Sequence, residues 1–205
     1  MLKLYYAPDT CALASHIALE HSGASYETVR VSFAAAEQRK PEYLAINPKG
    51  RVPSLVSDRG VLTETPAILL FVAQSYPRAH LAPLEDPFAL AQAQAFNSYL
   101  CSTVHVAHAH RMRGTRWSDD PATIEGMKRG APKSVSDAFG LIEHGMLKGP
   151  WVLGEAYSIC DMYLFTLAQW IEADGVDTAK FPRVMDHRRR VSELPAVRKS
   201  IAAEV

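Results

Sequence analysis

A single cysteine, Cys11, stands at the entrance to a predicted helix, directly after Asp9 and Thr10. The start of a helix presents unpaired N–H groups and partial positive charge, and both stabilise an anion. A cysteine in this position can therefore have a lowered pKa and a larger thiolate fraction. Ala14 occupies the place of the second cysteine of a C-x-x-C motif, so Cys11 could form a mixed disulfide only with an external thiol. A cysteine that simply packs is the alternative that its position leaves open.

A proline, Pro53, stands at the entrance to a predicted strand, after the turn in the segment Asn47–Leu55 (NPKGRVPSL). The Val52–Pro53 peptide bond at such a turn can be cis. A cis bond would direct the N–H and C=O groups of Val52 towards solvent, where they could pair with an extended peptide as an added strand does. A trans proline that ends a loop is the commoner alternative for such a bond.

The segment TETPA places Glu64 and Thr65 before a third predicted helix. If Thr65 caps this helix, its hydroxyl and the first N–H groups form an anion site. Glu64 offers a carboxylate to a cation, so the pair fits the ammonium and carboxylate of a free amino acid. An ordinary cap beside a solvated glutamate is the simpler interpretation.

Short strands and helices alternate in the first third of the chain, which indicates an α/β domain. A βαβ unit is predicted first, with Gly23 placed to end its helix. A hairpin turn at 58–60 and a further helix follow, so the predicted order is βαβ-ββα. Thr65 is predicted to cap that helix, with Pro66 at its first position. The predicted strands are Leu2–Tyr6, Tyr26–Phe33, Pro53–Ser57 and Val61–Thr63, and the predicted helices are Cys11–His21 and Glu64–Tyr76.

Prolines interrupt residues 78–87, where little periodicity remains, so this stretch is predicted to be a linker. Beyond the linker, apolar residues recur with helical spacing to the end of the chain. The sequence thus predicts a thioredoxin-like domain over 1–77 and an all-α helical-bundle domain over 88–205. The predicted helices of the second domain are Ala89–His110, Ala131–Leu147, Ser158–Ala173, Phe181–Val191 and Pro195–Ala203.

The charge balance is neutral, with 22 Lys and Arg residues against 22 Asp and Glu residues. General electrostatic attraction to nucleic acid or to an anionic membrane is therefore not expected. No apolar stretch is long enough to span a bilayer, and the first residues predict a strand rather than a signal peptide. The three cysteines, Cys11, Cys101 and Cys160, are odd in number and far apart. This pattern favours a reducing cytoplasm over a disulfide scaffold.

Cys11, Val52-Pro53 and Glu64-Thr65, in this order, resemble the N-terminal, thioredoxin-like domain of the glutathione transferases. The segments YYAPDTCALASHIALE and YLAINPKGRVPSL resemble the bacterial beta class, which has cysteine where other classes use tyrosine or serine. The likeness extends to STVH at 102–105 and to VLGEAYSICDMYLFTLAQW at 152–170, so it covers nearly the whole chain.

The resemblance implies catalytic roles for Cys11 and His105. Cys11 would lie beside the sulfur of glutathione, where it could form a mixed disulfide, and His105 would approach the same site from the second domain. The other implied glutathione contacts are the Val52 backbone beside a cis Pro53, Glu64 and Thr65 for the γ-glutamyl ammonium and carboxylate, and Ser102. Candidates for the hydrophobic substrate pocket are Tyr5, Tyr6, His108, Met112 and Trp170, with a core role equally open for Tyr5 and Trp170.

The expected function is a cytoplasmic, homodimeric glutathione transferase that conjugates the glutathione thiolate to small hydrophobic electrophiles, a detoxification activity. Conjugation requires a thiolate near neutral pH, and a helix start, a hydroxyl and a histidine can together lower the pKa of the thiol. A glutathione-dependent disulfide reductase or peroxidase is the close alternative. A non-catalytic regulator on the same fold is the second alternative.

Three further patterns are assigned to structure. The segment SICD, from Ser158 to Asp161, is predicted to be a capping box at a core helix, so Asp161 is not expected to be catalytic. His105, His108 and His110 lack an acidic residue or cysteine at ligand spacing, and no metal is expected. The basic run at 187–190 predicts a solvated helix face rather than a nucleic-acid contact.

Overall fold

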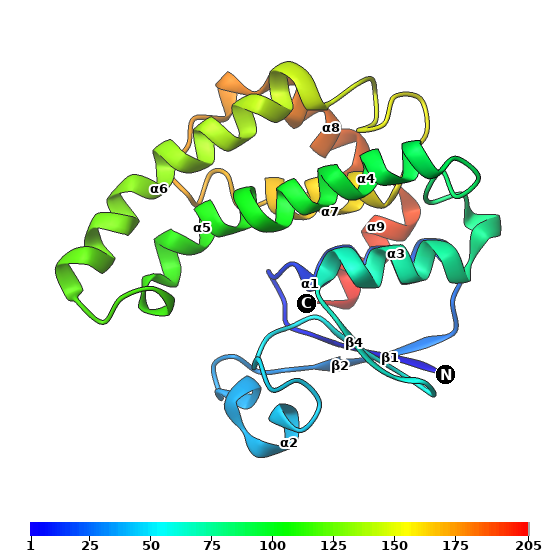
Figure 1. The fold of residues 1–205 in the computed structure, drawn as a ribbon, viewed down its shortest axis with the longest axis horizontal. Helices are drawn as coiled ribbons and strands as arrows, with labels where there is room; N and C mark the ends of the chain where they lie inside the picture. Colours follow the sequence, from blue (N-terminus) through cyan, green and yellow to red (C-terminus); the bar gives the residue numbers. More distant parts are fainter. Residues whose placement is uncertain (205) are drawn as a thin grey trace. The chain divides into compact units, whose positions relative to one another are not determined.

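The computed structural model describes residues 1–204, which form two compact units (Figure 1). The first unit comprises Met1–Ala91 together with the C-terminal residues from Val191 onwards, and the second comprises Gln92–Arg190. The C-terminal residues join the first unit because α9 (Pro195–Ala203) packs against α1 (Ala12–Ser22). The domain boundaries expected from the sequence, with a linker at 78–87, stay a prediction.

The first unit is built on a mixed four-stranded sheet in the order β2-β1-β3-β4. Its strands are β1 (Leu2–Tyr6), β2 (Tyr26–Arg30), β3 (Ser54–Ser57) and β4 (Gly60–Thr63). β1 pairs in parallel with β2 and antiparallel with β3, and β3 and β4 form the predicted hairpin. The predicted βαβ-ββα order is confirmed.

β2 ends at Arg30, before the predicted end at Phe33. Val31 still donates to the Tyr6 carbonyl at 2.7 Å, but the Ser32 N–H turns to the Glu37 carboxylate at 2.7 Å and leaves the sheet. A 3₁₀ turn (Glu37–Arg39) and the short helix α2 (Pro41–Leu44) follow, and the sequence analysis had not assigned either.

Three helices, α1, α3 (Thr65–Ser75) and α9, cover one face of this sheet, while α2 lies on the opposite side (Figure 1). Every residue of α1 from Ala12 to Leu19 is buried, because the helix is enclosed by the sheet and by its two helical neighbours. Gly23 ends α1 at φ 71°, as predicted, and its N–H donates to the carbonyls of the last turn.

The long elements described in the second unit are all helices. The described helices are α4 (Pro87–Tyr99, which begins in the first unit), α5 (His105–Met112), α6 (Pro121–Leu141), α7 (Ile159–Ala168) and α8 (Pro182–Ser192). π-helical turns occupy Leu100–Val104 and Ile142–Met146, and 3₁₀ turns occupy Gly114–Arg116 and Thr178–Lys180. A further 3₁₀ turn, at Pro77–Ala79, belongs to the first unit. None of the helices of residues 1–204 is long and apolar enough to cross a membrane.

Three helices differ clearly from their predicted bounds. The helix predicted as Ser158–Ala173 ends five residues early, because α7 stops at Ala168. The run predicted as Ala89–His110 is interrupted by the first π-helical turn. The helix predicted to begin at Ala131 begins ten residues earlier, because Asp120 caps it by accepting from the N–H groups of Ala122 and Thr123. Glycines and Pro132 within this helix weakened its periodic pattern.

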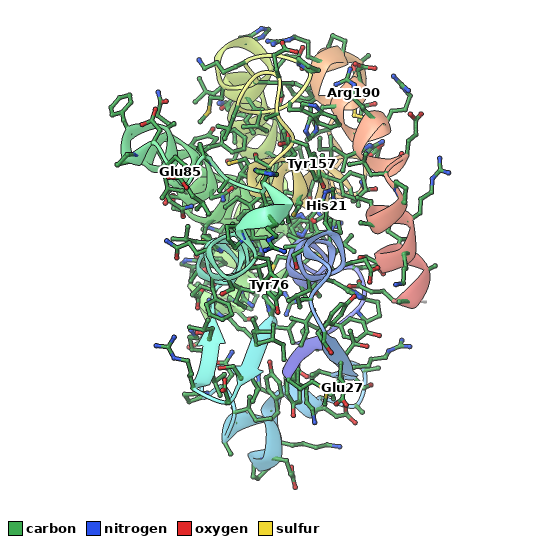
Figure 2. The ribbon with its side chains drawn as sticks, turned by 90° about the vertical axis from the view of Figure 1, so that its right-hand side faces the viewer. His21, Glu27, Tyr76, Glu85, Tyr157 and Arg190 are labelled. Carbon is green, nitrogen blue, oxygen red and sulfur yellow. The ribbon has the colours of Figure 1, made fainter. Side chains whose placement is uncertain are left out.

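α7 is the core of the second unit, with every residue from Ile159 to Ala168 buried. The predicted capping box is confirmed: the Ser158 hydroxyl accepts from the Cys160 N–H at 3.2 Å, and Asp161 accepts from the Ser158 N–H at 2.8 Å. Nearby, Figure 2 shows Tyr157 and Arg190, which both contact the Trp151 ring. Asp161 is therefore a structural carboxylate.

The pairing of Glu20 with Lys199 makes the attachment of α9 to α1 depend on pH. The Lys199 hydrogen bond, 2.6 Å long, lowers the pKa of Glu20 below its usual 4.5. This stabilisation is fully present above the unfolded pKa and is lost as pH falls through the folded pKa. At pH 7, E20Q should lower the free energy of unfolding by about 0.5–1 kcal/mol, a small cost because Lys199 is exposed.

Urea unfolding as a function of pH measures this effect, with E27Q as the control because the Lys3–Glu27 pair is exposed and 3.6 Å long. The difference between E20Q and wild type should shrink below pH 4.5. A difference that stays constant down to full protonation of the carboxyl would contradict the assignment.

Candidate functional site

Cys11 is the N-cap residue of α1, and its side chain is buried against the strand entrance. Its Sγ atom lies 3.6 Å from the Val52 carbonyl oxygen, to which the thiol donates. Thr10 satisfies the first N–H of the helix, because its hydroxyl accepts from Ala12 at 3.3 Å. The structure thus brings together Cys11 and Val52, two predicted site residues that are distant in sequence.

The Val52–Pro53 bond is cis, which confirms the first interpretation of this turn. The carbonyl of Val52 faces the Cys11 thiol, so the expectation that this carbonyl points into solvent is wrong. Among residues 1–204, the hydrogen bonds include no acceptor for the Val52 N–H. The pairing of this N–H with an extended peptide stays a prediction.

A polar network that the sequence analysis missed holds the loop before this bond. Asn47 donates from Nδ2 to the Arg51 carbonyl at 2.7 Å and to the Ser54 hydroxyl at 3.1 Å. The Tyr43 hydroxyl reaches the same two groups, at 2.6 Å and 3.0 Å. Burial raises the pKa of Tyr43, so its phenol stays a proton donor. The Asn-Pro pair at 47–48 was the available signal for a rigid turn.

Glu64, not Thr65, is the N-cap residue of α3, so the predicted cap is wrong by one residue. Glu64 has φ 71°, a conformation that a non-glycine residue adopts at a cost of roughly 1–3 kcal/mol. Its carbonyl nevertheless accepts from the Ile68 N–H at 3.0 Å, which starts the helix. Thr65 is the first helical residue and is buried, and Pro66 follows it.

The Glu64 carboxylate already holds an ammonium group. Lys49 Nζ lies 2.5 Å from Glu64 Oε1 and 2.7 Å from the Thr63 hydroxyl. Both charged side chains are about half exposed, so this pair can open at little cost. The geometry therefore supports the expectation that Glu64 can bind a cation.

In the second unit, a π-helical turn immediately precedes His105, the first residue of α5. Ser102 lies within this turn and is exposed, whereas Leu100 and Val104 are buried. The extra residue of a π turn changes which side chains share a face, and such turns are frequent at functional sites. His105 contacts the ring of Trp170, with the ring centroids 5.4 Å apart.

His108 also contacts Trp170, in a stacked arrangement at 4.3 Å and 25°. Its Nδ1 atom lies 2.8 Å from both carboxylate oxygens of Asp174, and Arg111 donates from Nε to the same carboxylate at 2.8 Å. The Asp174 side chain is only 1% exposed. Sequence analysis named His108 and Trp170 but missed Asp174, which no local motif marks.

The other predicted pocket residues lie in different settings. Tyr6 is buried in the first unit, where its hydroxyl donates to the Ala203 carbonyl of α9 at 3.3 Å. This placement gives Tyr6 a packing role and does not support a role in a substrate pocket. The Tyr5 ring packs against Tyr43 at 5.9 Å. Met112, at the end of α5, is 65% exposed.

Cys160 is fully buried, which keeps its thiol away from solvent. Desolvation and the nearby Asp161 charge raise the pKa of its thiol to about 12, so it stays protonated. No group of three or more His, Cys, Asp or Glu side chains in residues 1–204 is arranged to hold a metal ion.

Residues 1–74 match the model of the glutathione S-transferase N-terminal domain. The chain is 30% identical to glutathione S-transferase GstA of Escherichia coli O157:H7 over 206 residues, which cover 99% of this chain and 98% of that protein. The chain belongs to the glutathione S-transferase family.

Two solved structures of related proteins extend this likeness to the whole fold. A glutathione transferase homologue from Sulfitobacter, crystallised with bound glutathione, is 45% identical with a TM-score of 0.93, covering 99% of this chain and 96% of that one. A beta-class glutathione S-transferase from Sphingomonas chungbukensis is 31% identical with a TM-score of 0.86, covering 98% of each chain. A thioredoxin-like N-terminal domain followed by a helical domain is therefore confirmed.

In this glutathione S-transferase, Gly50 allows the loop that carries Lys49 to pack closely against the backbone of Gln38. A Cβ atom at Gly50, where φ is 60°, would lie 2.8 Å from the Gln38 carbonyl oxygen. At Gly23, where φ is 71°, the same atom would meet nothing within 4 Å. Both alanine variants strain the backbone, but only G50A adds a steric clash.

G50A should therefore lower the free energy of unfolding by at least 1 kcal/mol more than G23A, a difference in the range of overpacking costs. Chemical denaturation of the two variants side by side measures it. Equal losses would mean that the loop moves away from Gln38 without cost.

Proposed function

We propose that this family member is a cysteine-type transferase of the beta class that conjugates glutathione to small hydrophobic electrophiles. The observation that carries the proposal is the contact between the Cys11 thiol and the Val52 carbonyl. It places a thiol beside a backbone segment with an available N–H group, which suits a ligand that is both a peptide and a thiol. Glutathione is such a ligand and would act as the co-substrate.

In this proposal, the first unit supplies recognition groups for the cysteinyl and γ-glutamyl parts of glutathione. The Val52 N–H would pair with the cysteinyl residue, next to Pro53. Glu64 would bind the γ-glutamyl ammonium, in place of Lys49, and the hydroxyl and N–H groups at Thr65 would bind its carboxylate. Lys49, once displaced, would be left near the anionic groups of the ligand.

The family resemblance also implies Ser102 and His105 as glutathione contacts, and the proposal includes them. An imidazole can donate a hydrogen bond to a thiolate and so favours the ionised sulfur. The thiolate then attacks an electrophilic carbon, and the leaving group departs. We further propose a homodimer in the cytoplasm with a role in detoxification, on the basis of the same resemblance.

Disulfide exchange is the second candidate, because Cys11 is a thiol at the proposed position of the glutathione sulfur. The Cys11 thiolate would attack the glutathione sulfur of an external mixed disulfide, which forms a Cys11–glutathione disulfide and releases the other thiol. A second glutathione thiolate would then attack that disulfide, which frees Cys11 and yields glutathione disulfide. Peroxidase activity would use the same sulfur chemistry.

Glutathione binding is tested by calorimetric titration of wild type and E64Q. Wild type should release heat and gain thermal stability at millimolar glutathione, whereas E64Q should bind at least tenfold more weakly because it loses the charge that pairs with the ligand ammonium. E42Q, at an exposed site on α2, is the matched control and should bind like wild type. No heat and no stabilisation of wild type would instead favour a non-catalytic regulator.

C11A separates the two candidate activities. Conjugation should survive at least in part, because glutathione brings its own thiol, whereas exchange of a mixed disulfide should collapse without the Cys11 sulfur. Parallel assays with an activated aryl chloride and a glutathione mixed disulfide measure this, with C101A as the control. Equal loss of both activities in C11A would contradict this division of roles.

A further inference from the structure

The ammonium group of Lys49 already occupies the carboxylate to which the proposed function assigns the ammonium of the ligand. Lys49 Nζ lies 2.5 Å from Glu64 Oε1 and 2.7 Å from Thr63 Oγ1. Thr63 is the last residue of β4 and Glu64 is the N-cap residue of α3, so this contact lies at the start of the helix. The side chain of Lys49 is therefore an internal competitor for the Glu64 carboxylate.

The backbone on both sides of Lys49 is held in place, so its side chain moves by itself. The Lys49 N–H donates to Asn47 Oδ1 at 3.2 Å, and the Asn47 amide donates to the Arg51 carbonyl at 2.7 Å. Gly50 packs so closely that a Cβ atom there would lie 2.8 Å from the Gln38 carbonyl oxygen. A lysine ammonium is a point charge on a flexible four-carbon stem. Once displaced, it therefore stays tethered close to the carboxylate that it leaves.

The γ-glutamyl end of glutathione carries an ammonium and a carboxylate on one carbon. When this ammonium replaces Lys49 at Glu64, the carboxylate beside it lies close to the tethered lysine. Each of the four charges then keeps a partner of opposite sign. A ligand with the ammonium alone would leave Lys49 unpaired, and a ligand with the carboxylate alone could not displace Lys49.

We propose that Lys49 is a specificity-determining residue that exchanges its ammonium between Glu64 and the α-carboxylate of the γ-glutamyl group. The inference rests on the proposed function and deepens it, because the exchange selects ligands that carry both charges of an amino-acid head group. The favoured class is thus a γ-glutamyl peptide with a free α-ammonium and a free α-carboxylate. Simple amines and N-acylated peptides are disfavoured by the same ion pair.

The Lys49–Glu64 pair lies at the surface, which limits the size of the effect. The two side chains are 43% and 53% exposed. Exposed ion pairs change an equilibrium constant by about fivefold at most, so a ligand can open this pair readily. The pair therefore changes the ranking of ligands without closing the site to glutathione.

Calorimetric titration of wild type and K49M with two analogues of glutathione tests the exchange. The decarboxy analogue has γ-aminobutyrate in place of the γ-glutamyl group, and the deamino analogue has glutarate there. K49M should bind the decarboxy analogue about threefold to fivefold more tightly, because the competing ammonium is gone. K49M should bind the deamino analogue more weakly by about the same factor, because Glu64 is left unpaired beside an anionic ligand. Glutathione should bind within about twofold of wild type, since the gain and the loss oppose each other.

K49R and K3M are the control variants. Arginine keeps the charge on the loop, so K49R should bind the three peptides in the wild-type order. Lys3 pairs with Glu27 at 3.6 Å, and these side chains are 41% and 51% exposed, much like the Lys49–Glu64 pair. K3M therefore removes the same charge from the first unit and should leave all three affinities as in wild type. Melting temperatures identify any variant that fails to fold.

Opposite shifts for the two analogues cannot come from a general loosening of the site, which would weaken both. If wild type binds glutathione but K49M shifts both analogues in the same direction, or shifts neither, the inference is overturned and the proposed function stands. If wild type does not bind glutathione, both are overturned.

Discussion

The candidate site depends on the contact between the start of α1 and the entrance to β3. The Cys11 thiol donates to the Val52 carbonyl, and this single contact joins a helix N-terminus to a strand that is remote in sequence. Buried polar groups need partners, so the thiol and the carbonyl each satisfy the other. Beside this contact, the Val52 N–H has no acceptor among the hydrogen bonds of residues 1–204. That pairing is what supports the proposal of a thiol-containing peptide as the ligand.

The loop that carries Lys49 holds the backbone on both sides of this contact in place. Tyr43 and Asn47 converge on the Arg51 carbonyl and the Ser54 hydroxyl, so the residues on either side of Val52 are held by four hydrogen bonds. A network of this kind orients the backbone without touching a ligand. The loop also delivers Lys49 to Glu64, which keeps the carboxylate paired.

The second unit contains a buried carboxylate, Asp174, that needs cationic or hydrogen-bonding partners. A carboxylate as buried as Asp174 is costly unless it is paired, and His108 and Arg111 share that task. The arrangement orders α5 against the segment after α7 and fixes one imidazole beside Trp170. Asp161 is used in a comparable way, since it binds backbone N–H groups and the buried His187 ring. Asp161 thus holds a helix cap in place, and Asp174 holds the His108 ring in place.

Local chemistry in the sequence determined most of the elements and several of the candidate residues. Gly23 ends α1 because only a residue that tolerates positive φ fits there, and Ser158 with Asp161 caps α7 through neighbouring N–H groups. The start of α6 was missed because glycines and a proline disturb its period, although Asp120 was a sufficient cap signal.

Tertiary structure alone decided the pairings between distant residues. The Cys11–Val52, Lys49–Glu64 and His108–Asp174 contacts each join separate segments, and no spacing rule specifies them. The positive φ of Glu64 and the π turn before His105 likewise have no signal in the local sequence. Local rules act over a few residues, whereas these contacts form only when folding brings distant segments of the chain together.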